Sequence, residues 1–128
     1  MPNRLHILIY FGVSEKNINT IVSDGKRFMA YKIVERLKEH NTTEILLQLS
    51  EAVINSDKDK GKIHQVFKRS FDCKEITSQH FFLQKLSYMH NNSCSGVWNL
   101  VKNPVEYEHS SAKYYISGEQ AGYSIKEE

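Results

Sequence analysis

Apolar residues recur every three or four positions from Ile18 to about residue 40, and this pattern constrains the fold more than any other feature. Residues at that spacing share one face of an α-helix. We therefore predict a long amphipathic helix, capped at its start by Asn17 or Asn19. The apolar positions are Ile18, Ile21, Val22, Gly25, Phe28, Met29, Ile33 and Leu37.

Two other segments alternate between inward and outward side chains with the period of a β-strand. They cover residues 5–11 and 65–71, and we predict a strand for each. Further helices are predicted over residues 42–53 and after a cap at Thr77 or Ser78, with a short helical turn over 110–115. The polar stretch 55–62 is predicted to be an exposed loop.

The chain has 128 residues and a formal net charge of +2, which fits one domain and neither requires nor excludes a nucleic-acid partner. We find no apolar run long enough to span a membrane and no signal-peptide pattern after Met1. Cys73 and Cys94 have no metal-site spacing and are predicted to be free thiols. These features together predict a cytoplasmic protein with no membrane association.

Tyr88 and Asn92 are the residues whose spacing most suggests chemistry. Because they are four residues apart on a predicted helix, their side chains can address one point in space, and His6 on a predicted strand could join them. Tyrosine is a rare covalent nucleophile, and its usual task on DNA is transesterification. The alternative is that Tyr88 is an ordinary half-buried aromatic residue.

Basic residues cluster on the first helix and on the second predicted strand. Lys26, Arg27, Lys68 and Arg69 are candidate contacts to DNA phosphates, and the neighbouring Phe residues could stack on bases. A solvated charged helix face and a charged edge strand would explain the same residues without DNA.

Several strings, taken in order, resemble the single-tyrosine HUH transposases, and most of all the group associated with repetitive extragenic palindromes. Met1-Pro2-Asn3 followed by His6 is similar to MPNHxH. Tyr88-Met89-His90-Asn91-Asn92 is similar to YIHxNP, and the run from Tyr107 through Ser110-Ser111-Ala112 to Tyr115 is similar to YxxSSAxxY. The match extends from Met1 to about Tyr123.

The resemblance implies an α+β fold, a ferredoxin-like antiparallel sheet with helices packed on it, over residues 1–123, followed by a frayed tail at 124–128. It implies a transposase that cleaves and rejoins single-stranded or hairpin DNA through a 5′-phosphotyrosine intermediate. By position, Tyr88 is the nucleophile, and His6 and Asn92 ligate a divalent metal, Mg²⁺ or Mn²⁺. The protein would be a monomer or a homodimer.

The sequence departs from the family pattern at three places. Arg4 replaces the first ligand histidine, and a guanidinium has no lone pair to donate to a metal. It could impair catalysis or contact DNA itself. Ser93 replaces a proline and is expected to loosen the helix end. The first strand and helix of the family fold are expected to be missing. A non-catalytic DNA-hairpin-binding remnant and a helical protein-interaction domain therefore remain as alternatives.

Overall fold

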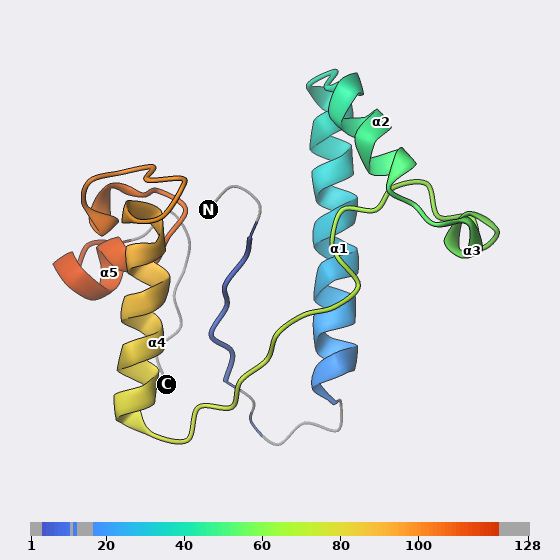
Figure 1. The fold of residues 1–128 in the computed structure, drawn as a ribbon. Helices are drawn as coiled ribbons and strands as arrows, with labels where there is room; N and C mark the ends of the chain where they lie inside the picture. Colours follow the sequence, from blue (N-terminus) through green and yellow to red (C-terminus); the bar gives the residue numbers. More distant parts are fainter. Residues whose placement is uncertain (1–3, 11, 13–16, 121–128) are drawn as a thin grey trace. The chain divides into compact units, whose positions relative to one another are not determined.

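The computed structural model describes residues 4–10, 12 and 17–120 (Figure 1). The chain divides into two compact units, one made of residues 11–73 and the other of residues 1–10 and 74–128. Phe11 of the first predicted strand, the domain end near residue 123 and the predicted tail 124–128 lie outside the described residues.

The unit of residues 11–73 is built on the long helix that the apolar periodicity predicts. Helix α1 spans Ile18–Glu39, and the Asn17 side chain caps it by accepting a hydrogen bond from the Thr20 amide at 2.9 Å. Helix α2 spans Thr43–Glu51 and packs against α1. Helix α3, Asn55–Lys58, occupies part of the stretch predicted as a loop. Both long helices were thus predicted correctly.

The unit of residues 1–10 and 74–128 is built on α4, Gln79–Asn91, which continues into the 3-10 turn η1, Asn92–Cys94. The Ser78 side chain caps α4 by accepting from the Phe81 amide at 3.2 Å, as the sequence predicts. A second 3-10 turn, η2 (Pro104–Glu106), and helix α5 (Ala112–Ser117) complete the unit, and η2 packs against both η1 and α5. Its buried residues include Leu86, His90 and Ala112.

The predicted ferredoxin-like antiparallel sheet is wrong, because the described residues contain helices and turns but no strand. A strand exists only when its backbone pairs with another strand. Residues 5–10 have no regular structure in the described part of the chain, and residues 65–71 use their backbone groups elsewhere. The backbone amide of Gln65 donates to the Leu49 carbonyl at 2.8 Å, which joins this segment to α2.

Lys26 attaches residues 68–71 to α1. Its ammonium group donates to the carbonyls of Lys68 and Ser70 at 2.9 and 3.0 Å, and to that of Arg69 at 3.4 Å. It also lies 5.4 Å from the centroid of the Phe71 ring. The Lys26 ammonium therefore binds backbone carbonyls that a neighbouring strand would have paired with in a sheet.

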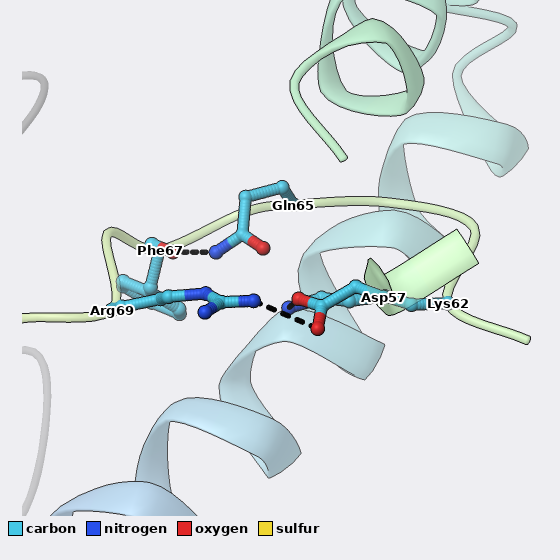
Figure 2. Close-up of polar contacts among 5 residues, drawn as sticks. All are labelled: Asp57, Lys62, Gln65, Phe67 and Arg69. Atoms are coloured by element: carbon cyan, nitrogen blue, oxygen red, sulfur yellow. Dashed lines mark hydrogen bonds and ion pairs between the residues drawn. The ribbon is translucent and has the colours of Figure 1, made fainter. Parts of the chain in front are cut away.

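Asp57 provides a second attachment for this segment, because its carboxylate pairs with Arg69 and with Lys62. Asp57 is 2.8 Å from Arg69 and 3.5 Å from Lys62, and Figure 2 shows its carboxylate facing both. Gln65 also donates to the Phe67 carbonyl. The hydrogen bond from Arg69 is the main cause that lowers the pKa of Asp57. This ion pair therefore contributes stability above the ordinary pKa of an aspartate and loses it in acid.

We expect Lys26→Met to release residues 65–71 from α1. Methionine keeps most of the aliphatic length but donates no hydrogen bond, so the unit of residues 11–73 should lose about 1–3 kcal/mol of stability. Hydrogen exchange should then be faster at residues 65–71. Lys32→Met is the matched control, because Lys32 lies on the same helix and pairs with the exposed Glu35. Equal exchange in the two variants would contradict this role of Lys26.

Candidate functional site

Tyr88 lies on the exposed face of α4 with a positive charge beside its ring. Its side chain is 54% exposed, so the phenol is open to a ligand. The Lys85 ammonium lies 6.0 Å from the Tyr88 ring centroid and 5.0 Å from that of Phe81, one turn earlier. The three residues form a continuous stripe along the helix, as their spacing predicts. A cation beside exposed aromatic rings suits an anionic ligand with flat groups, such as single-stranded DNA.

His6 is held against Tyr88 although the segment that carries it is not a strand. The two rings meet edge to face, with centroids 6.0 Å apart and planes at 87°. Partial burial, and then the nearby Arg4 charge, lower the pKa of His6. The neutral imidazole is therefore favoured at pH 7, and a neutral imidazole can accept a proton or donate a lone pair.

A hollow of about 320 Å³ opens beside His6, within the unit of residues 1–10 and 74–128. Three segments line it: residues 4–6, the end of α4 with η1, and residues 107–111. Its polar lining comprises Arg4, His6, His90, Asn92, Ser93, Tyr107, His109, Ser110 and Ser111. The two predicted metal ligands and Arg4 therefore share one hollow, with Tyr88 in contact with its wall through His6.

Asn92 sits where α4 turns into η1, four residues after Tyr88. Its backbone amide donates to the Tyr88 carbonyl, so the two residues are fixed to each other through the helix. The Asn92 side-chain nitrogen is buried and has no hydrogen-bond partner. A buried donor without a partner costs free energy of about 1–3 kcal/mol.

Ser93 stabilises the helix end, where the sequence comparison with the family strings predicted loosening. Its hydroxyl donates to the His90 carbonyl at 3.1 Å, and its own carbonyl accepts from the Leu100 amide at 2.8 Å. The side chain is buried. The Ser93 hydroxyl thus hydrogen-bonds a carbonyl at the helix end, at the position where the family strings have a proline.

His90 is a buried packing residue that also lines the hollow. It is only 4% exposed, its Nε2 lies 3.0 Å from the Ser111 hydroxyl, and its ring is 5.8 Å from that of Tyr115. Burial lowers the pKa of His90. The contact joins α4 to the start of α5, and so positions the segment that carries His109 and Ser110.

We expect the unit of residues 1–10 and 74–128 to lose stability as the pH falls below about 6.5. The lowered pKa of His90 means that the unfolded chain binds its proton first, so stability is complete above the ordinary histidine pKa and declines toward the lowered one. Denaturant unfolding followed by Trp98 fluorescence measures it. His6, whose pKa is also lowered, contributes in the same direction. His90→Gln should flatten the pH dependence, and an unchanged slope would contradict the assignment.

Of the five basic residues predicted to bind DNA, Arg4 lines the hollow, and the other four belong to the unit of residues 11–73, where most of them are engaged. Lys26 holds the 68–70 carbonyls, Arg27 pairs with Asp24 at 3.1 Å, and Arg69 pairs with Asp57. The Lys68 side chain is exposed and has no ion pair among the described residues. Of the four, Lys68 is therefore the best placed to meet a phosphate.

The donor set of the hollow does not fit a resident divalent metal. The predicted pair His6 and Asn92 supplies two donors, and the other lining groups are imidazoles and hydroxyls, whereas Mg²⁺ and Mn²⁺ prefer several oxygen ligands that include carboxylates. No carboxylate of the described residues lines the hollow, and Arg4 adds a positive charge. Among the described residues, no group of three or more His, Cys, Asp or Glu side chains could hold an ion. The metal role of His6 and Asn92 stays a prediction.

Sequence reasoning missed His109, Ser110 and Ser111 as parts of this site. They belong to the run of residues 107–115 that carries part of the family resemblance. The resemblance marked this run, but it assigned no function to these three residues. They share the hollow with His6, and the contact between His90 and Ser111 joins their segment to α4, which local periodicity does not reveal.

Comparisons with protein-family models, with curated proteins and with solved structures found no match for this chain. None of the helices in the described ranges is long and apolar enough to cross a membrane.

Proposed function

We propose that this protein acts on single-stranded or hairpin DNA as a transposase-type strand-cleaving protein, with Tyr88 as the nucleophile. The observation that carries the proposal is the contact between Tyr88 and His6 at the edge of a hollow that contains Arg4 and Asn92. An exposed phenol can attack phosphorus, a neutral imidazole can accept its proton, and the positive charges of Arg4 and Lys85 can stabilise the charge that develops on the phosphate.

The proposed step conserves the number of phosphodiester bonds. The Tyr88 oxygen attacks the phosphorus of a DNA diester, a bond forms between them, and the bond from phosphorus to the 3′ oxygen breaks. The phenol loses its proton and the departing 3′ oxygen gains one, with His6 as the group beside Tyr88 that can hold a proton between the two events. A strand bearing a 3′-hydroxyl can reverse the step, which rejoins DNA.

A second candidate is a protein that binds a DNA hairpin without cutting it. Arg4 favours this candidate, because it stands where the family strings have a metal-ligating histidine and because the hollow does not fit a metal. Binding would still use the charges of Arg4 and Lys85 on phosphates, and the Tyr88 and Phe81 rings on bases.

The test is to incubate the protein with a labelled hairpin oligonucleotide that has a single-stranded flank. The proposal predicts a labelled protein band that survives denaturation, and affinity that falls with salt at a slope of about 0.7 per neutralised phosphate. Salt-dependent binding without the band would support the second candidate. Absence of binding at low salt would contradict both.

A further inference from the structure

We infer that the hollow bounded by residues 4–6, the end of α4 and residues 107–111 is a seat for a phosphate group, held without a metal ion. The inference deepens the proposed function, on which it depends only for the natural source of the phosphate, a DNA diester. In the described part of the chain, the polar groups that line the hollow include one permanent cation and several hydrogen-bond donors, and no carboxylate.

The chemistry of the lining matches an anion with several acceptor oxygens. Arg4 carries a guanidinium, which can donate two parallel hydrogen bonds to one phosphate. His109 and Ser110 also line the hollow and add donors, and both belong to a segment that His90 and Ser111 join to α4. A phosphate seated there would meet donors from three parts of the chain.

The Asn92 side chain gives an independent indication of what the hollow binds. Its buried nitrogen is a hydrogen-bond donor that lacks an acceptor, although buried donors are nearly always paired. A cation cannot pair with an N–H group, whereas a phosphate oxygen can. The unpartnered donor and the Arg4 charge therefore both fit an anionic ligand such as phosphate.

The seat also explains how Arg4 could be tolerated at the position of a ligand histidine. A metal in a phosphoryl-transfer site offsets negative charge on the phosphate. A guanidinium in the same hollow offsets that charge directly, and it leaves His6 free to serve Tyr88. Arg4 and Asn92 are thus assigned to phosphate binding, and His6 keeps its contact with the nucleophile.

The experiment follows the Asn92 side-chain amide by nitrogen-15 NMR during titration of the full chain with inorganic phosphate, against sodium chloride of equal ionic strength. Asn92→Asp identifies the signal by removing it. We expect a saturable shift with phosphate and none with chloride. Arg4→Gln should weaken the affinity about tenfold or more, because a bidentate charged contact is lost. Arg36→Gln removes an exposed arginine from α1 and should leave the affinity unchanged.

Three further outcomes separate the seat from the proposed function. A short single-stranded oligonucleotide that competes with phosphate supports both. Phosphate binding that depends on Arg4 but is not displaced by the oligonucleotide supports the seat and counts against DNA as its source. Equal weakening in Arg4→Gln and Arg36→Gln, or a shift with Mn²⁺ and none with phosphate, overturns the seat whatever the fate of the Tyr88 chemistry.

Discussion

Tyr88→Phe should abolish the covalent product with a labelled hairpin oligonucleotide and leave binding nearly intact. The substitution removes one oxygen, which is the attacking atom in the proposed step, and keeps the ring that meets His6 and Lys85. We expect product formation to fall by at least about a thousandfold, as for loss of a covalent nucleophile. Denaturing gel electrophoresis measures the product, and fluorescence anisotropy measures binding.

The matched control is Tyr31→Phe, a change of the same kind on the exposed surface of α1. It should form the product at the rate of the unaltered protein. A product that persists in Tyr88→Phe would show that another residue is the nucleophile. Loss of binding together with the product would show instead that the Tyr88 hydroxyl positions the DNA.

Arg4→His should convert the hollow from a seat for an anion into a site for a cation. Two unit charges about 6 Å apart repel by about 3 kcal/mol at an effective dielectric of about 20, and a divalent ion doubles that. Exposure of Arg4 to solvent screens part of this repulsion. Since the change also adds an imidazole donor near His6 and Asn92, we expect affinity for Mn²⁺ to rise by at least about tenfold.

Calorimetric titration with Mn²⁺ measures this affinity, and Arg36→His is the control that adds a histidine away from the hollow. The same Arg4→His protein should bind inorganic phosphate more weakly and should nick DNA in a metal-dependent way. If nicking by the unaltered protein is already robust, persists in chelator and drops in Arg4→His, Arg4 is itself part of the catalytic machinery. Unchanged Mn²⁺ affinity in Arg4→His would contradict the account of the donor set.

The sequence predicted the helices well because their determinants are local. Asn17 and Ser78 cap the helices that follow them through side-chain bonds to amides three residues later. The strands failed for the opposite reason. Alternation over residues 5–11 and 65–71 indicates an extended backbone, but a sheet also needs a partner. The carbonyls of residues 68–70 found that partner in the Lys26 ammonium, which a reading of either segment by itself does not reveal.

The sequence predicted several residues of the candidate site, but it did not predict the charge of the hollow that they line. The spacing of Tyr88 and Asn92 and the position of His6 selected residues that the structure brings close together. The charge of the hollow depends on Arg4 and on the absence of lining carboxylates, which is a property of the whole lining. Lys26 and Arg69 were predicted to contact phosphates, but in the structure they bind the Lys68 carbonyl and the Asp57 carboxylate of their own unit.

The central claim is that Tyr88 becomes joined to DNA, and peptide mapping of the covalent product tests it most directly. The protein is incubated with a hairpin oligonucleotide, digested with protease and nuclease, and analysed by mass spectrometry. The account predicts one modified peptide, with a nucleotide attached through its 5′ phosphate to Tyr88. A nucleotide on any other residue, or tightly bound DNA with no modified peptide, would contradict it.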